Sequence, residues 1–332
     1  MIEDLSALKT FLKSDQCTLA SLTIGDTECF VLKMRTGQVI VRERHALPVV
    51  DGKTISSVFG ETNAARYAPL LQRPPQPTQE LERVVVVPGA TNYYHFLAFN
   101  LPGLLLLRFA KGERVTLATV LGFPGTAAAL LAKLLPMFAG NRPVDIVNLP
   151  DADYAVRDII FRAKPLMSTS IAIARLVQRT VLEAEGIADP YHSHGPVKLF
   201  VRRQGGANGR NLINQAEVEA WFVARGYLSV DPGTMTMEEQ IVLFSRASRI
   251  VGVEGAALAN MAFATHATGL VILASPNVRG DAFFAELASA AKLPFVTAYG
   301  DVAAVDAGNR TADFAFPPGR LEALPCDDTV LM

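Results

Sequence analysis

The sequence predicts an α/β protein made of two open-sheet halves that face a common cleft. Residues 83–87 form an unbroken β-branched run, which is typical of a strand buried on both faces of a parallel sheet. Similar runs alternate with helix-length segments in both halves of the chain. A polar segment with prolines and histidines, 189–196, separates the two series. We therefore expect an N-terminal domain over residues 1–188 and a C-terminal domain over 189–332.

The N-terminal half begins irregularly and continues as a regular alternation. Residues 1–60 mix polar and strand-like stretches, and we expect them to form an antiparallel, β-rich elaboration. After the strand at 83–87, Thr91 or Asn92 can cap a helix that carries His95 in its first turn. The remaining expected elements are strands at 115–121, 144–149 and 155–162 and helices at 126–138 and 171–185.

The C-terminal half alternates more regularly. Strands are expected at 197–201, 227–230, 250–253, 270–274 and 295–298, with helices at 215–225, 237–247, 256–264 and 282–291. Thr236 and Glu239 have capping-box spacing, which marks the start of the second of these helices. Two sheets of this kind are Rossmann-type domains, which bind small molecules beyond the carboxyl ends of their strands. We expect the C-terminal tail to pack back on the N-terminal domain.

Composition argues against several classes of function. The formal net charge is −1, so no global charge favours nucleic acid. The three cysteines are scattered and lack zinc-site spacing, which indicates a reducing compartment. The N-terminus is acidic where a signal peptide would be basic, and the most apolar run, 96–110, is interrupted by Asn100, Pro102 and Arg108. We expect a soluble cytoplasmic protein.

Three arginines indicate an anion-binding site in the C-terminal half. Arg202 and Arg203 directly follow the strand at 197–201, and Arg210 lies in the adjoining loop. Guanidinium groups at that edge suit the recognition of a diphosphate, although loop arginines are more often solvated. In the same half, Gly255 and Ala256 form a small-residue turn into a helix, where backbone N–H groups can bind an anion. Neither a Walker-type loop nor a dinucleotide fingerprint is present, which disfavours ATP and NAD.

Two titratable residues are candidates for proton transfer. His95 follows a buried strand early in a helix, so it is either a hydrogen-bonded structural residue or a group that contacts substrate and moves a proton. Glu254 stands directly at the proposed anion-binding turn. It can contact sugar hydroxyls, form a salt bridge to a nearby arginine or act as a general base, and we rank the first two roles above the third.

An ordered series of motifs resembles glycosyltransferase family 61. Members carry an arginine pair after a strand, then an arginine followed by asparagine and acidic residues, a Glu-Gln helix, and a strand that ends in a glycine-rich turn with a later asparagine. The matching residues here are Arg202, Arg203, Arg210, Asn214, Glu217, Glu239, Gln240, Gly252, Gly255, Ala256, Leu258 and Asn260. In the first half, residues 92–96 and Leu101-Pro102 look like the Tyr-His segment of the family. The resemblance covers roughly residues 85–275.

The resemblance implies a GT-B-like fold and inverting transfer of a hexosyl or pentosyl group from a nucleotide-sugar, with UDP as the expected nucleotide. The acceptor would be a hydroxyl of a bacterial capsular polysaccharide or glycolipid precursor, handled by a cytoplasmic protein peripherally associated with the inner membrane. We expect no metal and no other cofactor. The resemblance implies that Arg202, Arg203 and Arg210 bind the diphosphate and that Gly255, Ala256 and Asn260 form the turn beside it. Glu239 and Gln240 would orient the nucleotide or brace that turn. His95 or Glu254 would transfer the proton.

Two positions depart from the family pattern. Phe99 stands where bacterial members place an acidic residue, and Glu254 replaces the histidine of the glycine-rich turn. Either the base has moved to His95 or Glu254, or the acceptor is unusual, or transfer activity is impaired. In the last case the chain is a catalytically silent relative that binds a sugar nucleotide or glycan or scaffolds a biosynthetic complex. A Rossmann enzyme that modifies a sugar nucleotide, such as an epimerase, is a third and weaker alternative.

Overall fold

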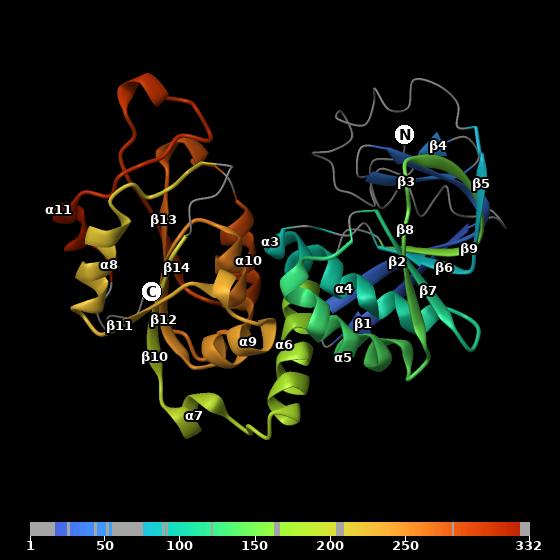
Figure 1. Cartoon of the computed structure of the whole chain (residues 1–332), viewed down its shortest axis with the longest axis horizontal. Coiled ribbons are helices and arrows are strands. Elements are labelled where there is room, and N and C mark those ends of the chain that lie inside the picture. Colours follow the sequence, from blue (N-terminus) through green and yellow to red (C-terminus); the bar gives the residue numbers. More distant parts are fainter. Residues whose placement is uncertain are drawn as a thin grey trace. The chain divides into compact units, whose positions relative to one another are not determined.

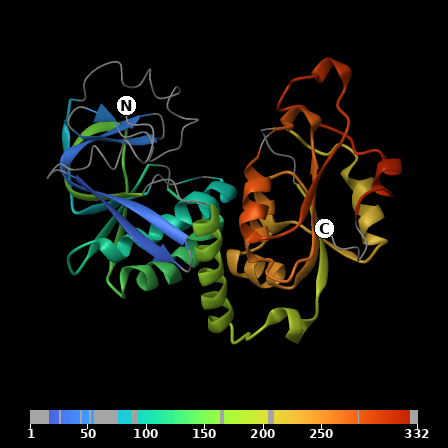
Figure 2. The same cartoon turned by 180° about the vertical axis from the view of Figure 1, so that it is seen from behind.

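The computed structural model describes residues 17–24, 27–42, 45–50, 53–54, 76–87, 90, 92–120, 122–162, 167–203, 209–280 and 282–325 (Figures 1 and 2). The chain divides into two compact units, Met1–Ile173 and Ala174–Met332. The division lies within helix α6 (Met167–Ala184), so the expected boundary at 188/189 falls inside the second unit. No helix in the described part of the chain is long and apolar enough to cross a membrane.

The first unit contains a nine-stranded mixed sheet, in which antiparallel strands from the N-terminal region extend a set of parallel strands. The sheet runs in the order β4-β3-β2-β9-β6-β7-β8, with β1 beside β2 and β5 beside β9. Its strands are β1 (Cys17–Ile24), β2 (Thr27–Arg42), β3 (His45–Val50), β4 (Lys53–Thr54), β5 (Gln79–Glu82), β6 (Val84–Val86), β7 (Val115–Thr119), β8 (Val144–Asn148) and β9 (Ala152–Arg162). Strand β9 is parallel to β6 and antiparallel to β2, and thereby joins the parallel strands to the antiparallel N-terminal elaboration.

One helical stretch of the first unit changes its winding along its length. It passes from α3 (Tyr93–His95) through the π-helical turn η3 (Phe96–Asn100) and α4 (Leu101–Gly103) to the 3₁₀ turn η4 (Leu104–Phe109). The Asn92 side chain caps its start, accepting from Tyr94 N at 2.8 Å. It contacts α5 (Ala128–Ala139), which follows the short turn η5 (Gly125–Ala127). The π and 3₁₀ turns are not visible in the sequence pattern, because an apolar run fits several helical windings equally well.

The second unit has a five-stranded, fully parallel sheet, as expected. Its strands are β10 (Val197–Val201), β11 (Tyr227–Val230), β12 (Ala247–Val253), β13 (Leu270–Ala274) and β14 (Phe295–Tyr299), in the order β11-β10-β12-β13-β14. The chain leaves β10 toward one edge and returns past it to β12. The carboxyl ends of these two strands therefore lie at a topological switch point, where open α/β sheets bind ligands.

Helices cover both faces of this second sheet (Figures 1 and 2). One layer contains α8 (Gln215–Val223) and α11 (Pro318–Leu321), and the other contains α9 (Met237–Ser245), the 3₁₀ helix η7 (Ala256–Phe263) and α10 (Phe283–Ala291). Thr236 and Glu239 form the expected capping box at the start of α9. The remaining short turns are η6 (Pro232–Thr234), η8 (Pro276–Val278) and η9 (Ala304–Asp306).

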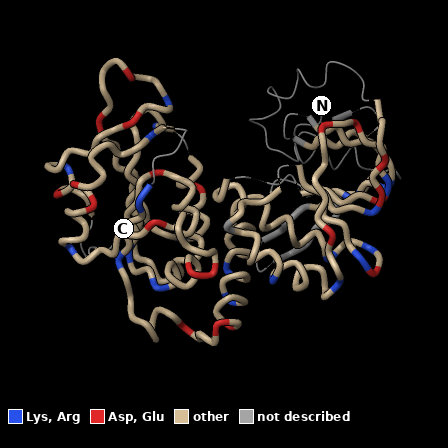
Figure 3. The backbone as a smooth tube through the Cα atoms, viewed as in Figure 1, with Lys and Arg blue, Asp and Glu red and all other residues tan. Residues whose placement is uncertain are grey.

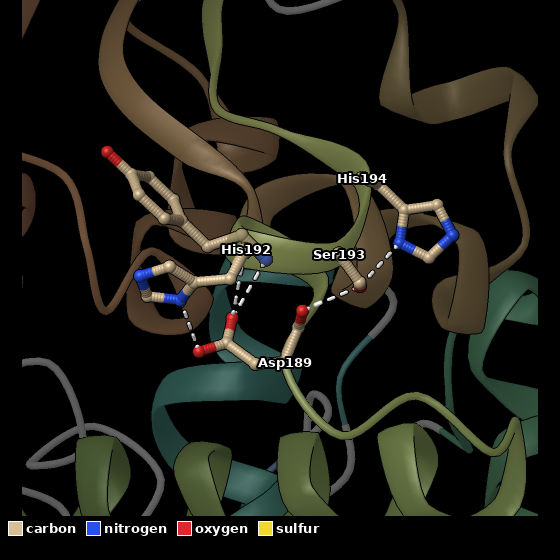
Figure 4. A network of polar contacts seen from close by, with 5 residues as sticks. Asp189, His192, Ser193 and His194 are labelled. Carbon is tan, nitrogen blue, oxygen red and sulfur yellow. Dashed lines mark hydrogen bonds and ion pairs between the residues drawn. The ribbon is translucent and has the colours of Figure 1, made fainter.

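The segment expected to link the two domains is an ordered part of the second unit. Asp189 caps the short helix α7 (Pro190–His194), and its carboxylate contacts His192 Nδ1 at 2.7 Å (Figure 4). The Ser193 hydroxyl lies 2.6 Å from Asp189 O and 2.9 Å from His194 Nδ1. His192 and His194 are exposed, and the hydrogen bond to His192 lowers the pKa of Asp189.

The described part of the C-terminal tail packs on the second unit, whereas we expected it on the N-terminal half. Phe314, Phe316 and Leu321 are buried in the same core as Phe200 of β10. Residues 212 and 314 form a parallel bridge, and the Asn214 side chain hydrogen-bonds both the N–H and the carbonyl of Phe316 at 2.9 Å. The tail thereby fixes the loop that follows β10.

Candidate functional site

The candidate site lies where β10 and β12 end. The two strands are parallel neighbours with Val201 opposite Gly252, so Arg202-Arg203 and Glu254-Gly255 leave the sheet side by side. A Cβ on Gly252 would lie 2.6 Å from the Leu258 side chain and 3.0 Å from Cβ of Val201. Glycine at this position therefore allows β12 to approach both β10 and η7 closely.

The Arg203 side chain connects two loops at this edge. Its guanidinium donates to the backbone carbonyls of Glu254, at 2.5 Å, and Gly209, at 3.0 Å. The Arg203 backbone N–H donates to Gln215 Oε1 at 3.1 Å, which ties the residue to the start of α8. The Arg203 Nε is buried and makes no hydrogen bond within the described part of the chain. Arg203 thus shapes the site as well as contributing positive charge to it.

Two like charges meet in this region. Burial lowers the pKa of Arg203, and the nearby positive charge of Arg210 lowers it further, while Glu254 and Asp313 act in the opposite direction. Arg210 is held in a left-handed conformation, with φ of 61°, directly after Gly209. A Cβ on Gly209 would overlap the carbonyl oxygen of Thr311, so this position requires glycine. Two partly desolvated guanidiniums that repel each other are stabilised by an added anion.

Arg202 is directed differently from Arg203. Its Nη1 lies 3.9 Å from Glu219 Oε1 on α8, and both side chains are only partly exposed. Its Nε is buried without a hydrogen-bond partner in the described part of the chain. The adjacent arginines of the motif therefore have different partners within the fold.

The turn after β12 brings a carboxylate and backbone N–H groups to the site. Glu254 is 7% exposed, and its backbone N–H donates to Leu273 O at 2.8 Å. Gly255 is fully extended, and a Cβ there would lie 2.8 Å from Nη1 of Arg203. Ala256 begins η7, so the expected helix is present with 3₁₀ winding. A side chain at position 255 would displace the Arg203 guanidinium, which lies against the turn.

Gln240 and Asn260 have contacts within the protein that support bracing of the turn, whereas Glu239 caps the start of α9. Asn260 Nδ2 donates to Gln240 Oε1 at 2.7 Å and to Ala257 O at 3.0 Å, and both side chains are buried. Gln240 Nε2 donates to Pro232 O at 2.9 Å. The Glu239 carboxylate accepts from Thr236 N at 2.7 Å, and this hydrogen bond lowers its pKa. Contact of these residues with a nucleotide stays a prediction.

His95 belongs to the first unit, on α3. It is exposed, its ring centroid lies 5.7 Å from those of Tyr94 and Phe99, and desolvation lowers its pKa. Phe99, at the family position of an acidic residue, lies in the π-helical turn η3. The lowered pKa favours the neutral imidazole, which is the form that can accept a proton.

The structure adds residues of the tail that the sequence pattern did not indicate. A cavity of about 590 Å³ lies between Gly209 and the tail. It is lined by three carboxylates and by apolar side chains, among them Asp301, Asp306, Asp313, Ile213 and Phe314. Asp313 also acts electrostatically on Arg203, so the cavity adjoins this arginine. No local motif links positions a hundred residues apart, which is why these carboxylates were missed.

Within the described residues, no group of three or more histidine, cysteine, aspartate or glutamate side chains is arranged to hold a metal ion. The acidic pair Asp151 and Asp153, which has the spacing of a metal-binding motif, lies where β9 begins, and Asp153 accepts from Gln76 N at 2.8 Å.

Comparison with known proteins identifies the family. The profile of glycosyltransferase family 61 matches residues 93–271. The chain belongs to glycosyltransferase family 61. The match includes His95 and all the motif residues from Arg202 to Asn260. The two motif positions that depart from the family pattern, Phe99 and Glu254, also fall within the matched range.

One solved structure similar to this family 61 chain is the bacterial iron-containing dodecameric glycosyltransferase TibC from enterotoxigenic E. coli H10407. The two are 12% identical with a TM-score of 0.32, and the similarity covers 74% of this chain and 64% of TibC. The chain therefore spans slightly less than two thirds of TibC. No curated protein sequence matches the chain.

Proposed function

We propose that the protein is an inverting, metal-independent glycosyltransferase of GT-B type that transfers a sugar from a UDP-sugar to a hydroxyl of a bacterial surface-polysaccharide or glycolipid precursor. The observation that carries this proposal is the Arg203–Arg210 pair at the switch point of the second sheet. We further propose that transfer takes place at the cytoplasmic face of the membrane.

The proposed step needs two kinds of group. The acceptor oxygen attacks the anomeric carbon as the bond to the diphosphate oxygen breaks, and a base takes the acceptor proton. The departing diphosphate gains negative charge, which preorganised cations stabilise more than they stabilise the ground state. Arg210 carries the more available guanidinium, because two nitrogens of Arg203 already donate to the carbonyls of Glu254 and Gly209.

The adjoining cavity suits the hydroxyl-bearing part of such a donor. Asp301, Asp306 and Asp313 line it and can accept hydrogen bonds from ribose or sugar hydroxyls. A site that pairs arginines with neighbouring carboxylates matches a ligand with phosphates at one end and hydroxyls at the other. A plain inorganic anion would use only the arginines.

His95 is our choice for the base, with Glu254 as the alternative. The neutral imidazole is favoured by the lowered pKa of His95 and is available for proton transfer near neutral pH. Glu254 lies near Arg203, and its negative charge offsets the positive charge of that arginine. This position suits a residue that balances charge or contacts a hydroxyl.

The proposal is tested by ligand-induced thermal stabilisation. UDP at about 100 times its dissociation constant should stabilise the wild type by about 2.7 kcal/mol, seen as a rise in melting temperature. We expect Arg203→Ala and Arg210→Ala to remove the rise. Arg203→Ala also removes hydrogen bonds to two backbone carbonyls, so the melting temperature of this variant without ligand should fall. Arg210→Ala tests the loss of the positive charge by itself.

The matched control is Arg225→Ala, which removes an arginine of the same unit that pairs with Glu322 at 3.2 Å. An unchanged UDP shift in Arg210→Ala and Arg203→Ala would remove both residues from the diphosphate site. A shift lost equally in Arg225→Ala would indicate a non-specific charge effect.

Phe99 and Glu254 favour a second candidate, a silent relative that binds a sugar nucleotide without transferring the sugar. The two candidates differ in turnover. UDP release from a UDP-sugar by the wild type, lost in His95→Ala or Glu254→Gln, argues for the enzyme. Saturable UDP-sugar binding without any UDP release, under acceptor screens that include glycans and glycolipids, argues for the silent relative.

A further inference from the structure

A second positively charged cavity lies in the first unit, far along the chain from the arginine motifs. It has a volume of about 230 Å³ and is located where β6 begins and where η4 leads toward β7. Four of its lining residues are cationic and one is acidic, namely Lys33, Arg35, Arg83, Lys111 and Asp158. Charges of both signs are interspersed along the described chain (Figure 3), so this local excess of cations differs from its surroundings.

Three of the four cations of this cavity have no ion-pair partner among the described residues. Lys33, Arg35 and Lys111 form no ion pair with another described residue, and Arg83 pairs only with its neighbour Glu82, at 3.4 Å. Lys33 Nζ instead lies over the ring of Phe109, 4.7 Å from its centroid. Four cations around a cavity with a single carboxylate, that of Asp158, leave an electrostatic preference for an anion.

The backbone is strained at the same place. Arg83 and Asp158 are both left-handed, with φ of 56° and 52°. Strand pairing places them opposite each other, because Glu82 pairs with Arg157 and Val85 with Ile160. Arg35 of β2 flanks Asp158 from the other side, so the three residues form one row across the sheet. Non-glycine residues in this conformation are uncommon and cluster at binding sites.

The cavity size and its walls limit the ligand. Its volume is below the 300 Å³ at which drug-sized sites roughly begin, so the ligand is small. Met34, Val84 and Ile160 supply apolar walls below the cationic rim. We propose that this cavity is an anion site separate from the donor site, and that it binds a phosphate ester carried on a small body. The phosphate can come from a free sugar phosphate or from the headgroup of an anionic lipid.

Calorimetric titration and vesicle co-sedimentation test the proposal on the full-length chain. A hexose monophosphate, or vesicles that contain phosphatidylglycerol, should bind saturably, and binding should weaken as salt increases. Lys33→Gln and Arg83→Asn should each weaken binding about tenfold. Asparagine is chosen at position 83 because it tolerates the left-handed backbone. Lys111 lies outside the strands, so Lys111→Gln replaces either variant in the test if that variant folds poorly.

The controls separate this site from the donor site. Arg114→Gln removes an exposed arginine of the same unit that does not line the cavity, and Arg210→Ala removes the proposed UDP contact. Both should retain phosphate-ester binding. Binding to the sugar phosphate alone identifies a free ligand, and binding to anionic but not neutral vesicles identifies a headgroup. The proposal would be overturned if neither probe bound to the wild type. It would also be overturned if Lys33→Gln, Arg83→Asn and Lys111→Gln all bound the probe as tightly as the wild type does.

Discussion

At the scale of single residues, Arg203 shows how a charged side chain can build the surface that it also charges. Its guanidinium donates to Glu254 O and Gly209 O, which lie in the loops after two different strands. A lysine has the same charge but offers one ammonium in place of a planar fork, and the two carbonyls would no longer be joined through one rigid group. The motif position therefore requires arginine for its shape.

The pKa of His95 leads to a prediction about activity. Desolvation lowers this pKa below its ordinary value of 6.5, so the imidazole stays neutral until the pH falls below that value. If His95 is the base, kcat/KM should be constant near pH 7 and fall on an acidic limb below pH 6.5. His95→Gln should lower kcat/KM by about 10²–10⁴-fold. A pH–rate profile of both proteins measures this, and an acidic limb with an apparent pKa above 6.5 would contradict it.

The same shift acts on stability with a defined sign. Below pH 6.5 the unfolded chain binds more protons at His95 than the folded chain does, so acidification through this range favours unfolding. The free energy of unfolding of His95→Gln should therefore fall less steeply from pH 7 to pH 5 than that of the wild type.

At the scale of elements, the capping box of α9 supports the frame of the site. Thr236→Ala removes the hydroxyl that accepts from Glu239 N, and we expect a loss of about 1 kcal/mol in the free energy of unfolding.

Hydrogen bonds from Thr236 lower the pKa of Glu239 below its ordinary value of 4.5. The stabilisation by Glu239 is then present above pH 4.5 and lost as the pH falls through the lower, folded-state pKa. Denaturant unfolding of Thr236→Ala and Glu239→Gln at pH 7 and at acid pH measures both effects.

Glu238→Gln removes the same charge from the same helical turn and is the control for Glu239→Gln. An equal loss of stability in the two variants at neutral pH would indicate that only the charge near the helix terminus matters, and that the capping geometry contributes nothing.

The elements of the second unit were predictable because short apolar strands alternate there with helix-length segments that begin and end at turn or capping residues. The bounds of β10, β11 and β13 agree with the pattern. For β13 the reason is plain, since an unalternating apolar run between turn residues has few other interpretations. The first unit was predicted less well. Whether a β-rich N-terminal region forms a separate sheet or extends a parallel one depends on long-range pairing such as that of β2 with β9, which no local period encodes.

The same reasoning applies to the site. The arginine pair and the small-residue turn could be located because they immediately follow strands of one parallel sheet. The sequence suggested Glu254 beside one of the arginines. It could not place Arg210 and Asp313 beside Arg203, because their proximity depends on how loops fold over the sheet edge. The internal contacts of Gln240 and Asn260 were equally hidden, since an amide in a motif can face a ligand or a backbone with the same sequence signature.

At the scale of the whole molecule, the chain has one tryptophan, and its position makes the second unit visible by itself. Trp221 lies on α8, with the Arg225 guanidinium 3.5 Å from its ring centroid. Its fluorescence should report unfolding of residues 174–332, whereas circular dichroism reports both units. We predict that UDP raises the midpoint seen by tryptophan fluorescence and that this rise is absent in Arg210→Ala.

The first unit provides the internal comparison for that measurement. Its helices and its nine-stranded sheet contribute to the circular dichroism but contain no tryptophan. A UDP effect on circular dichroism without any change in the tryptophan midpoint would place the nucleotide outside the second unit.

The packing of the tail against the loop after β10 has a consequence for synthesis of the protein. Arg210 N donates to Thr311 O, Asn211 N to Asp313, and Phe316 N to Asn214, so the loop with the arginines is held by residues translated about a hundred positions later. A nascent chain that has emerged only through β14 already has all five strands of the second sheet but lacks the support for this loop. Residues through 316 must therefore leave the ribosome before these hydrogen bonds can form, so the loop that carries Arg210 is one of the last parts of the second unit to be fixed.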